Sequence, residues 1–207
     1  MCLEQKKYEL LKDDTVNHNG RTLYRIKALI TFGTVVAGEL GGYIETEKNL
    51  DHSGNAWVCG NARVFEDARV YEDAEVFGNA EVFGNARVCG NARVFEDAEV
   101  YGNAEVYGNA DVLGNAEVFG NARVYGNAQV RSFAFIYERK MIFWASNVGS
   151  ENGTLTVFNG KDGLIVTRGC FTGTVDEFME RSKQVHDDKT HHEYKLLIEV
   201  AKSRILG

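Results

Sequence analysis

The amino-acid sequence predicts an all-β solenoid, a parallel β-helix in which short strands repeat along one axis. The first observation is a valine at every sixth position from Val58 to Val130, in 13 consecutive units without an insertion. The second is an alanine two residues before each valine, from Ala56 to Ala128. The third is the dipeptide before each alanine, which is Gly-Asn or, in three units, Glu-Asp.

The unit Ala-x-Val-x-Gly-Asn explains how such a coil forms. Residues two apart on a strand face the same way, so alanine and valine point inward and the residues beside valine point outward. Gly-Asn then turns the corner, because glycine accepts positive φ and Asn or Asp tolerates it. An α-helix needs a period of about 3.6 residues and would be destabilised by a glycine in every unit.

Composition and charge exclude several classes of protein. The chain has 207 residues, 44% of them apolar, which is too many for a disordered protein. No stretch approaches the roughly 18 apolar residues that span a bilayer, and the N-terminus lacks the apolar core of a secretory signal, so we expect a soluble, cytoplasmic protein.

Residues 54–131 contain 6 basic and 12 acidic side chains, which argues against bulk nucleic-acid binding. The four cysteines form no C-x-x-C motif, so no zinc site, redox pair or disulfide framework is expected.

The six-residue unit resembles that of the hexapeptide-repeat proteins over residues 54–131, and more weakly over residues 40–45, which we expect to keep the same phase. This resemblance implies a left-handed β-helix of triangular cross-section with three six-residue units in each coil. The wider pattern, with residues 21–44 before the repeats and a short tail after them, resembles hexapeptide-repeat proteins encoded by phages and prophages. Those proteins are described as acyltransferase-like or polymer-forming.

Three regions follow from this pattern: an N-terminal cap at 1–39, the β-helix at 40–140 and a C-terminal unit at 141–207. In the cap, Asn19-Gly20 between alternating runs is typical of a β-hairpin turn, and we expect a hairpin over 14–30 that covers the first coil. After the repeats, the apolar run 133–144 is expected to close the last coil.

The C-terminal unit is predicted to be ββαα. Residues 155–158 and 164–167 flank a glycine-containing loop, which predicts a hairpin. Thr174 and Glu177 form the capping box of a first helix, with Val175, Phe178, Met179 and Val185 on one side. A second helix carries apolar residues at helical spacing: Tyr194, Leu197, Ile198, Ala201 and Ile205.

The outward residue after each valine is mostly aromatic. Stacking every third unit places four of these rings on one face: Phe65, Phe83, Tyr101 and Phe119. The same face stacks Glu81, Glu99 and Glu117 in register after Arg63. One interpretation is a ladder of rings that only stabilises the sheet. The other is an interface for a partner with basic residues or for further copies of the chain, and the family resemblance implies a homotrimer.

A small anion site is a further hypothesis. Arg21, Arg25 and Lys27 share one face of the second hairpin strand, although this strand can equally serve only as a cap. Together with Arg168 they are our candidate residues for holding a small phosphorylated metabolite between protomers. The Glu-Asp pairs could bind Ca²⁺, but we interpret them as corner residues in which Asp replaces Asn, and we expect no metal and no cofactor.

The histidine distribution bears on catalysis. The acyltransferases of the hexapeptide-repeat family use a histidine base, and this chain has no histidine between His52 and His186. The repeats also lack loop excursions. A non-catalytic binding protein is therefore favoured, acting on a host protein or a small phosphorylated ligand. The alternatives are an acyltransferase with His52 or His186 as an atypical base, and a structural polymer, which the covered ends disfavour.

Overall fold

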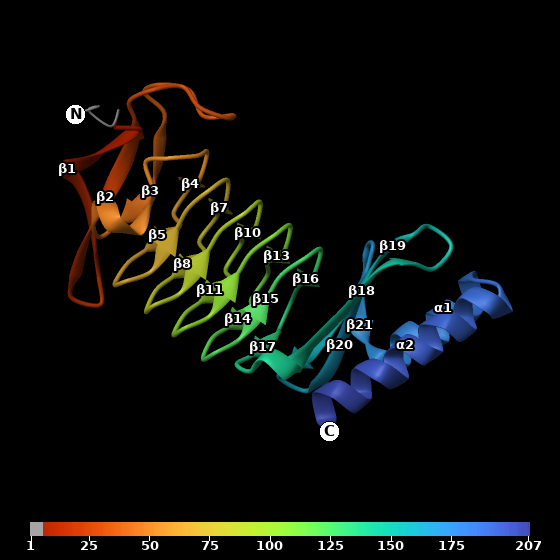
Figure 1. Cartoon of the computed structure of the whole chain (residues 1–207). Coiled ribbons are helices and arrows are strands. Elements are labelled where there is room, and N and C mark those ends of the chain that lie inside the picture. The colour runs from red at the N-terminus through yellow and green to blue at the C-terminus, as the bar shows by residue number, and fades with distance from the viewer. Residues whose placement is uncertain (1–5) are drawn as a thin grey trace.

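The computed structural model describes residues 6–207 and contains a parallel β-solenoid of about five turns. An antiparallel hairpin lies at its N-terminal end, and an antiparallel sheet with two helices lies at its C-terminal end (Figure 1). The predicted fold class is thereby confirmed. The left hand of the coil stays a prediction from the resemblance.

Three parallel sheets form the faces of the solenoid, and each strand pairs with the strand three units later, as Val64 does with Val82. This register confirms three units per coil. The acidic face consists of β5 (Arg63–Val64), β8 (Glu81–Val82), β11 (Glu99–Val100), β14 (Glu117–Val118) and β17 (Phe135–Ile136). The basic face consists of β6 (Arg69–Val70), β9 (Arg87–Val88), β12 (Glu105–Val106) and β15 (Arg123–Val124). The third face consists of β4 (Trp57–Val58), β7 (Glu75–Val76), β10 (Arg93–Val94), β13 (Asp111–Val112) and β16 (Gln129–Val130).

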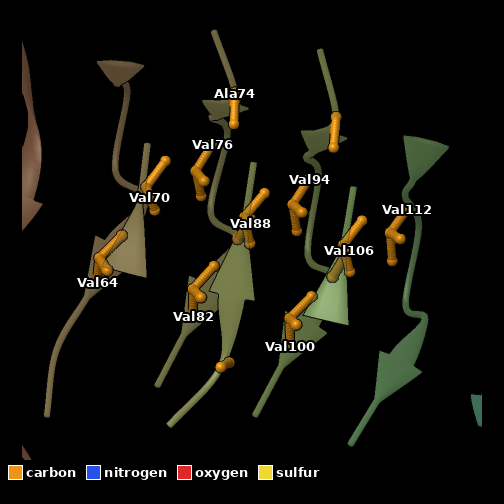
Figure 2. Packing of buried hydrophobic residues seen from close by; sticks show 14 of the residues in the cluster. Val64, Val70, Ala74, Val76, Val82, Val88, Val94, Val100, Val106 and Val112 are labelled. Carbon is orange, nitrogen blue, oxygen red and sulfur yellow. The ribbon is translucent and has the colours of Figure 1, made fainter. Parts of the chain in front are cut away.

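The interior of the solenoid contains the repeated small and branched side chains. Every alanine from Ala56 to Ala128 and every valine from Val58 to Val130 in the repeat is at most 1% exposed. The equivalent valines of successive coils form rows along the solenoid, as Val64, Val82 and Val100 do in Figure 2. The prediction that Val82, Val100 and Val118 fill the interior is confirmed, and burial of this apolar surface is the main stabilising term.

The corners require positive φ, and glycine supplies it in most units. Gly90 has φ of 71°, and a Cβ added there would lie 2.8 Å from the backbone nitrogen of Gly108 in the next coil. Most of the asparagines after the corner glycines hydrogen-bond to the equivalent side chain one coil away, as when Nδ2 of Asn103 donates to Oδ1 of Asn121 at 3.4 Å. Backbone stacking at the corners therefore excludes most side chains.

The Glu-Asp corners differ from the sequence-based expectation. The residue with positive φ is the glutamate, not the aspartate, at Glu66, Glu72 and Glu96. At two of these corners the glutamate carboxylate accepts the backbone N–H of the corner glycine one coil later, Gly84 at 2.9 Å and Gly90 at 2.7 Å. At these two corners the glutamate is tolerated because it satisfies a backbone donor. Glu96 stacks on the corner glycine of the preceding coil, Gly78.

The N-terminal hairpin extends the acidic face as well as covering the first coil. A turn at Asn19-Gly20 joins strands β1 (Tyr8–His18) and β2 (Arg21–Ala28), which pair antiparallel. Strand β2 also pairs with β3 (Leu40–Ile44), and β3 pairs in parallel with β5. The hairpin is thus longer than predicted.

The expected phase of residues 40–45 is wrong. Ile44 pairs with Val64, whereas the phase of the repeats would place it beside Ala62, and Leu40 is 52% exposed. The short helix η1 (Glu47–Asn49) follows β3, and the regular register begins only at β4, where Trp57 pairs with Glu75. The segment between β3 and β4 therefore accommodates the two extra residues.

Side chains satisfy the free carbonyls of the first coil. The ammonium of Lys7, 1% exposed, donates to the carbonyl of Ala56 at 2.9 Å, and Nδ2 of Asn49 donates to the carbonyls of Glu66 and Ala68. Burial lowers the pKa of Lys7 to about 8. Within residues 6–207, these side chains therefore occupy the carbonyls of Ala56, Glu66 and Ala68 that would otherwise be open to another solenoid.

The C-terminal unit contains four strands where two were predicted: β18 (Ile142–Val148), β19 (Gly153–Gly160), β20 (Gly163–Arg168) and β21 (Phe171–Thr174). The run 133–144 divides between β17, the short helix η2 (Arg139–Met141) and β18. Thr156 and Thr167 hydrogen-bond the backbone of Gln129, so the sheet seals the last coil.

Two helices complete this unit, α1 (Val175–Val185) and α2 (Asp188–Leu206). The predicted capping box is present, with Oγ1 of Thr174 accepting from the Glu177 backbone at 3.2 Å. Val185 was predicted on the buried side but is 60% exposed, because α1 ends there. Neither helix within residues 6–207 combines the length and apolar character needed to cross a bilayer.

Candidate interaction surface

The aromatic row on the acidic face is a continuous stack. The ring centroids of Phe65, Phe83, Tyr101 and Phe119 follow one another at 5.0, 4.9 and 4.9 Å, and the rings are within 8° of parallel. The three-unit register produces this stack, because it places equivalent side chains on neighbouring strands. The predicted grouping of these four residues is confirmed, whereas their role as an interface is still a prediction.

The N-terminal hairpin covers one end of the row. Phe65 is 4% exposed and packs with Leu23, Tyr43 and Val16, while the ring of His18 meets it edge-on at 5.1 Å. A partner can reach Phe65 only if the hairpin moves. Phe83, Tyr101 and Phe119 stay partly exposed.

Beside the rings, three carboxylates face their equivalents on the neighbouring strands, with Glu99 between Glu81 and Glu117. Glu81 contacts Nη1 of Arg63 at 2.6 Å and Nε2 of His18 at 3.2 Å.

Glu117 contacts Nζ of Lys161, in the β19–β20 turn, at 2.9 Å. Glu99 forms no ion pair within the described residues 6–207. Its pKa is raised, first by burial and then by Glu117 and Glu81. Neither His18 nor Lys161 was a sequence candidate, because nothing local marks a contact with a strand so distant in the chain.

The predicted basic cluster on β2 is largely neutralised. Arg21 contacts Glu45 at 2.9 Å and Glu66 at 3.1 Å. Arg25 contacts Asp14 at 2.7 Å, and its guanidinium lies 4.3 Å from the ring centroid of Tyr43. Lys27 lies on the same strand. An anion at this place would compete with carboxylates that already hold two of the three side chains.

Arg168 lies in the C-terminal unit, away from the other three predicted ligand residues. Its Nε donates to the hydroxyl of Tyr194 at 3.0 Å and its Nη2 to the carbonyl of Val148 at 3.3 Å. Within one chain the structure does not bring it to the residues of β2. The predicted ligand site is not tested by these contacts, but it would need a second protomer.

The two histidines considered as bases occupy different surroundings. His52 stacks on Tyr8 at 4.3 Å and accepts from the backbone of Lys7, and its buried Nε2 has no hydrogen-bond partner within residues 6–207. Burial lowers its pKa. His186 lines a cleft of about 230 Å³ together with Arg168 and Cys170. Within residues 6–207, no group of three or more His, Cys, Asp or Glu side chains is arranged to hold a metal ion.

The comparison with known proteins agrees with the geometry. A family model described as YdcK Beta solenoid repeat matches residues 86–102 and 116–132, which lie within the repeat region. No curated protein matches the chain. The fold and the matched repeats together define a β-solenoid repeat protein.

Proposed function

We propose that this protein is a non-catalytic binding protein whose acidic face holds a basic segment of a partner protein. The observation that carries the proposal is the position of Glu99, an ionisable group without an ion pair in the described chain, beside the partly exposed rings of Phe83, Tyr101 and Phe119. Phe65 is left out because the hairpin covers it.

Charge complementarity supports a cationic partner. Like charges directly opposite one another on neighbouring strands destabilise a sheet, and Glu99 has such a neighbour on both sides. An arginine or lysine placed there would relieve both repulsions, and its aliphatic stem could pack against the exposed edges of the stacked rings.

Self-association is the second part of the proposal, and a homotrimer is the assembly that we expect. The basic face carries Arg69 directly opposite Arg87, two like charges in register at the same strand spacing as the glutamates. A second copy could therefore supply cations to the acidic face. Light scattering at micromolar concentration tests this part, and a monomeric mass would contradict it. For a partner other than the chain itself, a host protein of a phage-encoded chain is our expectation.

Fluorescence anisotropy with a labelled peptide of alternating arginine and glycine tests the acidic face. We expect saturable binding that Glu99→Gln weakens about tenfold, the effect of losing one charge-assisted contact. Tyr101→Ala should weaken it as well. The matched control is Glu75→Gln, an exposed glutamate on the third face, which should leave the affinity unchanged. Equal affinities in all three variants and the unmodified protein would overturn the proposal.

A further inference from the structure

A cleft of about 460 Å³ opens where the basic face meets the C-terminal unit. Three arginines from three separate elements line it: Arg123 of β15, Arg139 of η2 and Arg204 of α2. Residues 123 and 204 are far apart in the sequence, so only the folded chain brings them together. A volume of this size is typical of small-molecule sites.

The charge of this cleft is opposite to that of the whole chain. The protein carries 30 acidic and 23 basic side chains, yet no carboxylate is among the residues that line the cleft. Nε of Arg123 lies 2.7 Å from the carboxylate of Glu105, a residue that does not line the cleft. Arg139 and Arg204 are exposed and form no ion pair within residues 6–207. Their guanidinium donors are available to an anion.

Lys140 increases the positive charge at this junction. Its Nζ donates to the carbonyl of Gly207, the residue that follows α2, at 3.3 Å. The negative end of the α2 dipole would otherwise oppose an anion near Arg204, and this contact offsets that effect.

The remaining wall of the cleft is largely aromatic. Tyr107 and Tyr125 stack at 4.9 Å with their planes 1° apart, and Trp144 meets Tyr125 edge-on at 4.3 Å. The indole lies against Gly126, where an added Cβ would be 2.9 Å from its Nε1. Phe143 extends the apolar surface. The wall is built from packed rings and is ready to receive a flat or apolar group.

We propose that this cleft binds an organic phosphate, with the phosphate on Arg139, Arg204 and Arg123 and the organic group against Trp144 and Phe143. Three arginines lining one cleft favour a compact dianion, because arginine pairs with phosphate oxygens through two parallel N–H donors. The tyrosine hydroxyls supply further donors, and burial raises the pKa of Tyr107, so its proton is retained. The solenoid as a whole is acidic, with 12 acidic and 6 basic side chains over residues 54–131, and repels a long phosphate polymer, which favours a small molecule.

This inference concerns the basic face and the C-terminal unit and does not rest on the proposed function of the acidic face. It also differs from the ligand site predicted at Arg21, Arg25 and Lys27. There, carboxylates contact two of the three cations, whereas here two of three arginines are unpaired in the described chain.

Isothermal titration calorimetry with phenyl phosphate, inorganic phosphate and phenol tests the proposal. Phenyl phosphate should bind saturably and more tightly than either of the other two probes. Arg139→Gln and Arg204→Gln should each weaken its binding about tenfold, and the double variant should abolish it. Trp144→Ala should reduce the preference for phenyl phosphate over inorganic phosphate.

Arg87→Gln is the matched control, because Arg87 lies on the same face but does not line the cleft. Glu99→Gln should bind phenyl phosphate as the unmodified protein does, which separates this site from the acidic face. Arg139 and Arg204 are exposed, so their variants should keep the thermal midpoint. Three results would overturn the proposal: no saturable binding at millimolar phenyl phosphate, equal binding by the double variant, or inorganic phosphate binding as tightly as phenyl phosphate.

Discussion

Nζ of Lys161 lies 2.9 Å from the carboxylate of Glu117, so the turn between β19 and β20 neutralises the last glutamate of the acidic row. At the other end Arg63 forms an ion pair with Glu81, and Nε2 of His18 contacts the same carboxylate at 3.2 Å. Contacts at both ends of the row therefore occupy Glu81 and Glu117, and in the described structure Glu99 is the glutamate of this row that is available to a partner.

Removing this lysine should strengthen binding of a cationic peptide. In Lys161→Gln the carboxylate of Glu117 becomes available, and we expect the arginine–glycine peptide to bind about two- to fivefold more tightly, the effect of one partly exposed charge. Anisotropy at constant salt measures it. Lys189→Gln, an exposed lysine in α2, controls for net charge, and an equal gain in that variant would contradict the assigned role of Lys161.

Glu99→Gln should stabilise the protein at neutral pH. The pKa of Glu99 is raised above its usual 4.5 by burial and by its two neighbouring glutamates, so its ionised form is disfavoured in the folded state. The unfolded state therefore releases this proton first as the pH rises, and stability falls between pH 4.5 and the raised pKa.

We expect a gain of a few tenths to about 1 kcal/mol for the Gln variant at pH 7, shrinking to nothing below pH 4.5. Urea unfolding at several pH values measures it. A gain that does not change with pH would show that the glutamate charge is not its cause.

Lys7 should produce a rise of stability in alkaline solution. Burial lowers its pKa to about 8 in the folded protein, and the usual value in an unfolded chain is 10.5. Above pH 8 the folded state loses this proton first, so the free energy of unfolding should increase between pH 8 and 10. Above pH 10 Tyr8 opposes this, because burial raises its pKa and the unfolded state then ionises first.

Lys7→Met isolates this effect, since every other titrating group is common to both proteins. The variant should be less stable at pH 7, because the carbonyl of Ala56 loses its donor, at a cost of about 1–3 kcal/mol. Its stability should also rise less than that of the unmodified protein from pH 8 to 10. Parallel curves for the two proteins would be inconsistent with a buried, shifted lysine.

Corner glycines should be more sensitive than other glycines with positive φ. Gly90→Ala places a residue at φ of 71° and brings its Cβ to 2.8 Å from the backbone of Gly108. Gly169 has a similar φ of 56°, and within residues 6–207 no heavy atom lies within 4 Å of a Cβ added there. We expect about 1–2 kcal/mol of destabilisation at Gly169 and clearly more at Gly90. Equal losses in urea unfolding would mean that the contact between coils relaxes freely.

Val100→Thr tests the interior of the solenoid. The two side chains have nearly the same shape, and Val100 is fully buried between Val82 and Val118. The hydroxyl would enter an apolar interior, and we expect a loss of about 1–3 kcal/mol. Tyr71→Thr at a partly exposed outward position should cost less. A smaller loss at Val100 than at Tyr71 in thermal unfolding would contradict the buried valine column.

The repeat could be predicted well because its signal is local. Each unit contains the alternating Ala and Val and a turn dipeptide. The same pattern recurs every six residues in 13 consecutive units. The sorting of Phe83, Tyr101 and Phe119 onto one face also followed from the spacing. The C-terminal sheet was only half predicted, since β18 and β21 lack a clear alternation of apolar and polar residues.

By itself, the sequence determined the solenoid, its buried valines and the two ladders of rings and charges. These features depend on neighbouring residues or on residues separated by a constant spacing, so the sequence pattern reveals them. Only the tertiary structure decided that His18 and Lys161 contact two of the three glutamates, that a hairpin covers Phe65, and that Arg123, Arg139 and Arg204 share one cleft. Those contacts join the two non-repeating ends to the solenoid. Because they do not recur at a regular spacing, the sequence pattern does not reveal them.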